Sequence, residues 1–344
     1  MGSGVLAHQH VYMMNQVTTR SLSTTPQNAY MQYVRLRKSR KTREKLQSCV
    51  LPGSKLVEEC FQRKSKPFIQ QLFLDESQPE WTRKRWEKKA KQLNIHVTTI
   101  PSTSRDFDRD QNFPNMTGLS GGTEGVAAII DLPHIYTDPK KAASLLRRPN
   151  ARVLALDALQ DPGNVGTLIR TAYLFEWDMV CLGVGTADTT NDKVTRASGG
   201  TTWDQPLFRG CISELVSEMV AQADDDRPVQ YVVADHSADA ECRGRGGVVV
   251  AQRDSEADNK NVQEDVQEDE RGASSAAAAA AAAAVILVLG NEGNGTTLET
   301  PKAVLGSATK VKVQTREATM VGSLGVASAG AVLMHALSVQ SKET

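Results

Sequence analysis

Short apolar runs alternate with longer amphipathic stretches along the second half of the chain. The runs at residues 153–156, 179–182, 231–234, 285–289 and 310–313 have the length and composition of buried strands. The stretches at residues 165–175, 212–222 and 324–337 repeat their apolar positions with the period of a helix. Strands that alternate with helices in this way predict an α/β domain with a parallel sheet, which we expect to span residues 151–344.

The first half of the chain predicts a smaller α/β domain at residues 27–133. Apolar clusters occur at residues 49–51 and 68–74, and a helical pattern occurs at residues 81–93. A turn that contains Gly118, Gly121 and Gly122 precedes a strand-like run at residues 126–130. We expect residues 134–150 to form a linker between the two domains.

Residues 239–284 interrupt the alternation of strands and helices in the second domain. They contain the run Arg243-Gly244-Arg245-Gly246-Gly247, an acidic cluster between Asp254 and Glu270, and a run of alanines at residues 276–284. Such a composition lacks the large apolar residues that form a core. A disordered low-complexity insertion between two strands is therefore predicted.

The charges are distributed unevenly along the 344 residues, although the formal net charge is zero. No acidic residue precedes Glu44, whereas arginines and lysines are frequent between Arg20 and Arg43. Without the acidic cluster of the insertion, the rest of the chain is basic, and this bias favours a polyanionic partner. The content of 40% hydrophobic and 23% charged residues is typical of a soluble globular protein.

Cysteine spacing and hydropathy narrow the class of protein further. The five cysteines are odd in number and form no CxxC pair, so we expect free thiols and no metal site. No apolar run is long enough to span a bilayer, so no membrane partner is expected. Residues 1–26 are rich in Ser and Thr and lack acids, which fits either a disordered tail or a transit peptide. An intracellular location is expected, with chloroplast or mitochondrion and cytoplasm left open.

Three segments with candidate chemistry each follow or flank a predicted strand. The first, residues 156–172, has a turn at Pro162 and Gly163, an expected helix N-cap at Asn164, and Arg170 about a turn and a half further on. The second, residues 288–295, is an apolar strand that runs into a glycine-rich loop around Glu292. The third, residues 315–334, has Ser323 as an expected cap of a helix of small residues. Taken singly, each segment is also compatible with a purely structural role.

Together, in this order and spacing, the three segments resemble the SpoU/TrmH family of RNA ribose 2′-O-methyltransferases, which belongs to the SPOUT superfamily. Residues 191–200 are similar to the family pattern N-P-K-x-x-R-A-S-x-G, and residues 27–31, 53–59 and 115–126 are similar to its amino-terminal RNA-binding domain. Two departures occur in the third segment. Gly325 stands where the family usually has Asn, and Thr315-Arg316-Glu317 stands where it usually has Ile-Pro-Met.

The resemblance implies a trefoil-knotted parallel-sheet domain preceded by the smaller RNA-binding domain. It also implies a homodimer that uses S-adenosylmethionine (AdoMet) to methylate a ribose 2′-oxygen in structured RNA, either tRNA or rRNA. Arg170 is expected to stabilise the charge that develops on that oxygen, because its guanidinium stays protonated. Asn164 and Ser323 would position the ribose or Arg170, and Glu292 would hold the loop or orient Arg170. The expected cofactor contacts are Leu289, Gly290, Gly293, Thr315 and Leu324, and the expected RNA contacts are Arg35, Arg37, Lys38, Arg40, Lys193 and Arg196.

Two alternatives remain at the level of sequence. One is a SpoU-like protein that binds RNA but is weakened in, or has lost, methyl transfer, which the two departures in the third segment make possible. The other is an unrelated nucleotide-binding enzyme with an open doubly wound sheet. That class requires a glycine-rich fingerprint after the first strand, and the nearest fragment is Gly183-Val184-Gly185 after a later one.

Overall fold

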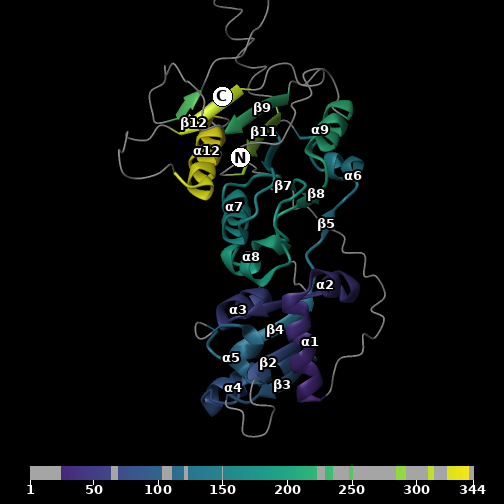
Figure 1. Cartoon of the computed structure of the whole chain (residues 1–344), viewed down its shortest axis with the longest axis vertical. Coiled ribbons are helices and arrows are strands. Elements are labelled where there is room, and N and C mark those ends of the chain that lie inside the picture. Colours follow the sequence, from purple (N-terminus) through teal and green to yellow (C-terminus); the bar gives the residue numbers. More distant parts are fainter. Residues whose placement is uncertain are drawn as a thin grey trace, which may run out of the picture.

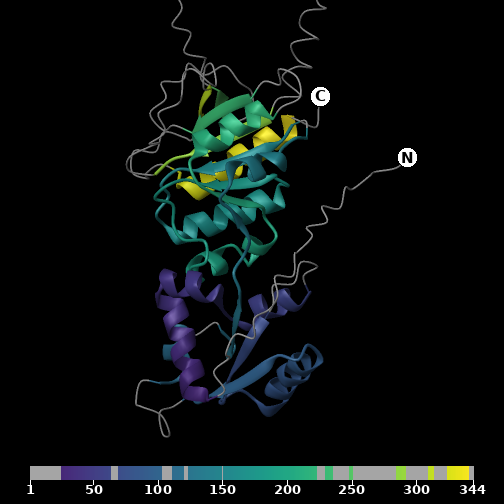
Figure 2. The ribbon, with the colours of Figure 1, turned by 90° about the vertical axis from the view of Figure 1, so that its right-hand side faces the viewer.

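The computed structural model describes residues 25–62, 69–102, 111–119, 123–148, 150–222, 229–234, 248–250, 284–291, 309–313 and 324–340. They form two sheets, each covered by helices on both faces, and Figures 1 and 2 show these two units stacked along the long axis of the molecule. Within this part of the chain, no helix has the length and hydrophobicity that a membrane-spanning segment needs. The four described cysteines are free thiols, as expected.

The amino-terminal unit is built on a mixed four-stranded sheet. Its strand order is β1 (Ser48–Pro52), β4 (Val126–Asp131), β2 (Ile69–Asp75) and β3 (His96–Ile100), with only β2 and β3 parallel. Helices α1 (Pro26–Lys38), α2 (Arg40–Leu46) and α5 (Phe113–Thr117) pack on one face, and α3 (Ser54–Gln62) and α4 (Glu80–Gln92) pack on the other. The strands are apolar on both sides for this reason: in β4, Ala127 and Ile129 face one core, and Ala128 and Ile130 face the other.

The second unit contains the larger, mostly parallel sheet. Its strand order is β10 (Val248–Val250), β12 (Thr309–Val313), β9 (Val229–Ala234), β11 (Ala284–Leu289), β6 (Arg152–Leu156), β7 (Met179–Leu182), β8 (Leu207–Arg209) and β5 (Ile135–Tyr136). Only β10 runs antiparallel to its neighbour. Helices α7 (Pro162–Leu174), α8 (Asp192–Ala197) and α12 (Val326–Gln340) cover one face, and α6 (Pro139–Ser144) and α9 (Ile212–Ala221) cover the other. The α/β class predicted from the hydrophobic pattern is confirmed.

Two segments differ from the sequence-based expectation. Residues 134–150, expected as a linker, contain β5 at the edge of the large sheet and α6 against α9, because Asp138 caps a short helix that begins at Pro139. The expected insertion at residues 239–284 contains β10, which pairs with β12, and its last alanine begins β11. The division into domains otherwise stays a prediction, and residues 1–24 and 251–283 lie outside the described residues. The chain threading that would define a knot involves residues 292–308 and 314–323, which also lie outside them.

The two units meet at a seam between α2 and the segment that leads into α8. The Arg43 side chain is only 3% exposed and donates hydrogen bonds to Asp188 Oδ2 at 2.6 Å and to Thr190 Oγ1 at 2.9 Å. On the same seam, the Trp203 indole in the short 3-10 helix (Thr201–Trp203) donates to the Asp131 carbonyl at 3.0 Å and packs into the amino-terminal core. A buried ion pair and an inserted aromatic ring therefore fix the small unit against the region around α8.

Candidate functional site

The first two chemical segments lie side by side at the carboxyl edge of the large sheet. Strands β6 and β11 are parallel neighbours, so the turns that follow Leu156 and Leu289 are adjacent. The Asp157 amide donates to the Leu289 carbonyl at 2.9 Å, and the Asn291 side-chain amide donates to the Ala158 carbonyl at 3.1 Å. Ala158 takes a left-handed conformation with φ of 53°, which turns the chain sharply after β6. This edge of an open α/β sheet is where ligands of such folds bind.

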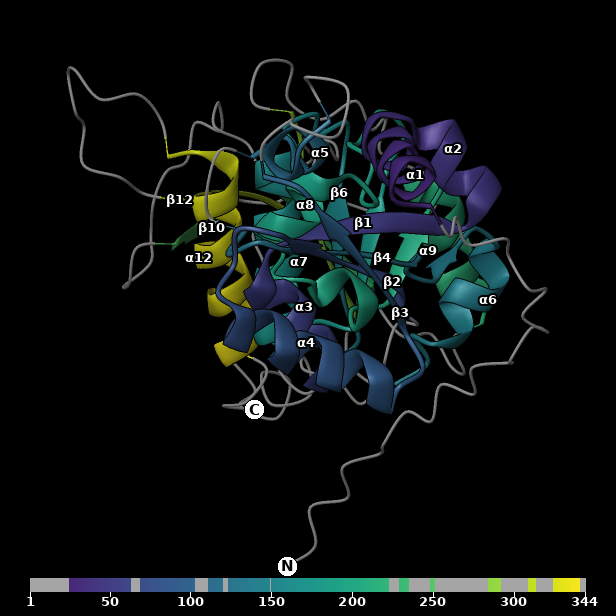
Figure 3. The same cartoon turned by 90° about the horizontal axis from the view of Figure 1, so that it is seen from below.

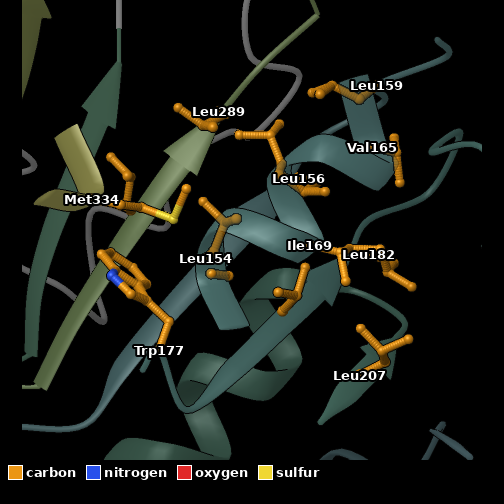
Figure 4. Packing of buried hydrophobic residues seen from close by; sticks show 14 of the residues in the cluster. Leu154, Leu156, Leu159, Val165, Ile169, Trp177, Leu182, Leu207, Leu289 and Met334 are labelled. Carbon is orange, nitrogen blue, oxygen red and sulfur yellow. The ribbon is translucent and has the colours of Figure 1, made fainter. Parts of the chain in front are cut away.

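The third segment is brought to the same place by α12. An ideal Cβ atom on Gly330 would lie 2.5 Å from Leu168 of α7 and 2.7 Å from Leu289 at the end of β11, so α12 crosses both at very close range. Leu333 and Met334 of α12 continue this contact into the core, where Figure 4 shows Met334 beside β11. The small residues predicted for this helix thus serve close packing, and all three segments share one core.

Helix α7 also packs tightly on α8, which lies within the family-like pattern at residues 191–200. An ideal Cβ atom on Gly166 would lie 2.6 Å from the Val194 carbonyl oxygen and 2.6 Å from Ala197 Cβ. Gly199, just after α8, has φ of 59°, and its ideal Cβ position lies 3.6 Å from Arg170 Nη1. Arg170 and Gly166 therefore both face α8, as their spacing predicts, and the exposed Arg170 lies over the turn that ends α8.

Substitution of Gly166 tests this close approach. We expect Gly166→Val to lower the free energy of unfolding by about 1–3 kcal/mol, because the backbone of α8 blocks the new side chain. Thr167→Val serves as the matched control, because it introduces the same valine at the neighbouring, exposed position of α7. It should change stability by less than about 0.5 kcal/mol. Urea unfolding monitored by circular dichroism measures both. Equal stability of the two variants would contradict the packing argument.

The expected N-cap at Asn164 is wrong. Asp161 occupies that position, and its carboxylate accepts a hydrogen bond from the Asn164 amide at 2.7 Å. The reason is Pro162, which has the fixed φ and the missing N–H that suit the first helical position, so the residue before it becomes the cap. Asn164 consequently lies within the first turn of α7, where its half-buried side chain sits at the carboxyl edge of the sheet.

The other expected site residues divide into those that the structure describes and those that lie outside the described residues. Leu289 is buried, Gly290 is half-buried, and Leu324 is 41% exposed just before α12. Among the described residues, no heavy atom lies within 4 Å of an ideal Cβ position on Gly325, so none of them blocks the Asn of the family pattern. Glu292, Gly293, Thr315 and Ser323 lie outside the described residues, so their roles stay predictions. Asn291, which links the two turns, was not singled out from the sequence.

The expected RNA contacts have different surroundings. Arg35, Lys38 and Lys193 are exposed. Arg40 pairs with Glu44 at 2.7 Å on the surface, and Arg196 pairs with Asp192 at 3.3 Å. Arg37 is half-buried, and its guanidinium lies against Gly118. Contact of these residues with RNA stays a prediction.

The fold and the converging segments define an α/β protein with a candidate ligand site at the carboxyl edge of its larger sheet. The model of the SpoU rRNA Methylase family matches residues 151–335, and the chain belongs to this family. Its crystal-structure neighbours include the SpoU methyltransferase AviRb of Streptomyces viridochromogenes, solved in complex with AdoMet, with a TM-score of 0.60 and 16% identity over 92% of this chain and 99% of that one. Another is the AdoMet-bound rRNA methyltransferase of Sinorhizobium meliloti, with a TM-score of 0.58 and 19% identity over 93% and 97% of the two chains.

Curated relatives align over shorter stretches. The 23S rRNA (guanosine(2553)-2′-O)-methyltransferase RlmP of Bacillus subtilis is 39% identical over 90 residues, which are 24% of this chain and 36% of that protein. The chain thus spans less than half the length of the curated relatives that it matches. These relatives support the family and the fold, and their activities bear on the function proposed below.

Proposed function

We propose that this protein transfers the methyl group of AdoMet to a ribose 2′-oxygen in RNA. One observation carries the proposal: the turns after β6 and β11 and the helix α12 meet at one edge of the sheet, where α7, the helix that carries Arg170, also begins. Membership of the SpoU rRNA methylase family and the 2′-O-methyltransferase activity named for the RlmP relative support it.

The residues at this edge are suited to hold AdoMet. The chain backbone around Ala158 and Gly290 is presented by two turns tied together by the Asn291 side chain, and Leu289 supplies an apolar floor beneath them. When bound, AdoMet supplies an electrophilic methyl group. The protein's own contribution is to hold the ribose oxygen in line with that group and to exclude competing water.

Arg170 is the residue that we assign to charge stabilisation. A ribose hydroxyl is a poor nucleophile, and negative charge grows on its oxygen as the proton leaves. A guanidinium is a cation with five donors and no acceptor, so the exposed Arg170 stabilises this charge or anchors the adjacent phosphate and does not remove the proton. Asn164, about a turn and a half earlier in α7 and at the carboxyl edge, is placed to position the ribose.

A homodimer is part of this proposal. Helices α7 and α12 pack against each other and carry three partly exposed apolar side chains, Tyr173, Leu174 and Val332, of which Leu174 is 64% exposed. Apolar side chains grouped on one surface favour association with another protein. A second copy of the chain on this surface would lie next to the Arg170 helix. The molar mass measured by light scattering distinguishes monomer from dimer.

Incubation with tritiated AdoMet and total RNA tests the proposal. Label that becomes acid-precipitable with the RNA, in either the tRNA or the rRNA fraction, supports it. RNA binding without any incorporation instead supports the alternative of a SpoU-like RNA-binding protein that has lost methyl transfer.

A substitution at Gly325 tests whether the absence of the family's usual Asn at this position slows methyl transfer. Because Gly325 immediately precedes α12 and none of the described residues lies within 4 Å of its ideal Cβ position, we expect Gly325→Asn to fold normally and to cap the helix better. If the missing Asn limits catalysis, the variant raises the initial rate of incorporation several-fold. An unchanged or lower rate would contradict the idea that this departure slows the enzyme.

A further inference from the structure

The outer face of α4 in the amino-terminal unit carries a concentration of cations that the family-like motifs do not include. The helix has six Lys or Arg residues and two Glu residues, in a chain whose formal net charge is zero. Its buried side consists of Trp86 and Ala90, which pack into the core beneath the sheet. At 100° per residue, the direction opposite these two residues is centred on Lys88.

Four cations and one aromatic ring share this outward arc: Trp81, Lys84, Arg85, Lys88 and Lys91. The side chains of Lys84 and Arg85 are 70% and 59% exposed, and Trp81 is 71% exposed. No other aromatic residue in the described part of the chain is as exposed as Trp81. A large ring held in water beside a row of cations is therefore the distinguishing feature of this face.

The ion pairs of α4 leave much of this charge available. Lys89 and Arg85 share Glu58 of α3, and Lys84 pairs with Glu80 at 2.7 Å. Within the described residues, Lys88 and Lys91 have no ion-pair partner. An ordinary solvated helix balances such lysines with acids three or four residues away, which stabilise it modestly. Lys91 has Glu87 at that spacing, whereas the residues at that spacing from Lys88 are basic or uncharged. The excess of positive charge on the outward face of α4 is therefore suited to bind a negatively charged ligand.

We propose that this α4 face, Trp81 with Lys84, Arg85, Lys88 and Lys91, is a binding surface for the RNA substrate, and the proposal rests on the methyl-transfer function above. The cations contact backbone phosphates, and Trp81 stacks on an unpaired base. A bilayer surface is a poorer fit, since a membrane-bound helix inserts an apolar face, and the apolar face of α4 is already buried in the core.

The surface lies away from the AdoMet edge. Figure 3 shows α3 and α4 on one side of the small sheet and α1 and α2 on the other, and Figure 1 places α4 at the end of the molecule distant from the large sheet. Contacts there add affinity and orient a long substrate without touching the reacting atoms. On α1 and α2, Arg37 and Arg43 point inward and Arg40 pairs with Glu44. Other cations of these helices are exposed, but both tyrosines of α1 are buried, so that face has no exposed ring comparable to Trp81 among the described residues.

Binding of a fluorescein-labelled RNA hairpin with a single-stranded loop, measured by anisotropy at 0.1 M salt, tests the proposal in the full chain. We expect the triple variant Arg85→Gln/Lys88→Gln/Lys91→Gln to bind roughly tenfold more weakly or worse, with a log–log salt slope reduced by about 2–3. Trp81→Ala should weaken binding roughly 5- to 100-fold, whereas Trp81→Phe, which keeps a ring, should recover most of it. The matched control is Lys140→Gln/Lys141→Gln/Arg147→Gln, which removes three exposed cations at and just beyond α6 in the second unit, with an expected change within about twofold.

Methyl transfer provides the second readout. We expect the α4 triple variant to raise the KM for RNA while kcat at saturating RNA stays within about twofold. Equal losses of binding in the α4 and control variants, or unchanged binding in the α4 variant, would overturn the proposal even if the wild type methylates RNA. A wild-type protein that binds and methylates no RNA would overturn the proposed function itself.

Discussion

Arg170→Ala is expected to lower kcat for RNA methylation by about 10²–10³, the usual cost of losing one preorganised group that stabilises developing charge. Because Arg170 is exposed on α7, its truncation is a surface substitution, which usually costs little stability. The thermal midpoint and RNA affinity should therefore change little. Initial rates with tritiated AdoMet at saturating RNA measure the effect.

Two further variants make the Arg170 experiment specific. Arg170→Lys keeps the positive charge but loses the planar fork of donors, so an intermediate rate is expected. Arg147→Ala removes an exposed guanidinium beyond α6, on the opposite face of the sheet, and should leave the rate unchanged. An Arg170→Ala variant that retains more than about a tenth of the wild-type kcat would rule out the assigned role.

Arg43→Ala is expected to cause the largest loss of stability, about 2–4 kcal/mol, because it removes a buried guanidinium and leaves the partly buried carboxylate of Asp188 without its cation. Besides Asp188 and Thr190, the guanidinium donates to the carbonyls of Leu36 at 2.7 Å and Arg37 at 3.1 Å, and these also lose their donor. Urea unfolding measures the free energy. Hydrogen exchange should report faster exchange at residues 185–191, the segment that leads into α8.

Arg40→Ala is the matched control for this variant. Arg40 lies on the same helix and also forms an ion pair, but both partners are 54% exposed, so we expect a loss below about 1 kcal/mol. Comparable losses of stability for Arg40→Ala and Arg43→Ala would show that the Arg43–Asp188 pair stabilises the protein no more than an exposed ion pair does.

We expect the ion pair between Arg43 and Asp188 to make the free energy of unfolding depend on pH in the acidic range. Burial raises the pKa of Asp188, but hydrogen bonds from Arg43 and Thr190 outweigh it and hold that pKa below its ordinary value. A carboxylate with a lowered folded-state pKa stabilises the protein above the unfolded-state pKa of about 4, and this contribution is lost as the pH falls through the folded-state value. The stability difference between wild type and Arg43→Ala should therefore narrow below about pH 4.

The sequence predicted the central elements well because their signals are local. The apolar runs of β6, β7, β9, β11 and β12 and the periodic stretches of α7, α9 and α12 appear within a few residues of their predicted bounds. Local signals were also present for two features that were missed. Asp161 before Pro162 and Asp138 before Pro139 mark helix starts, and the run of valines at residues 248–250 marks a strand inside otherwise low-complexity sequence.

Other features could not be predicted from one sequence because they depend on contacts between distant segments. Arg43 and Asp188 are 145 residues apart, and neither lies in a motif that suggests the other. The bond from Asn291 to Ala158 joins segments 133 residues apart. The outward arc of α4 is readable as a helical pattern, but only the packing of Trp86 and Ala90 shows which side faces water.

The position of the transferred methyl group tests the central claim most directly. RNA labelled with tritiated AdoMet is hydrolysed in alkali, which requires a free 2′-hydroxyl next to each phosphodiester that it cleaves. The account predicts that the label is recovered in alkali-resistant dinucleotides, because a 2′-O-methylated ribose protects its own linkage. Label recovered in mononucleotides would place the methyl group on a base, and that result would contradict the assignment of this site to ribose chemistry.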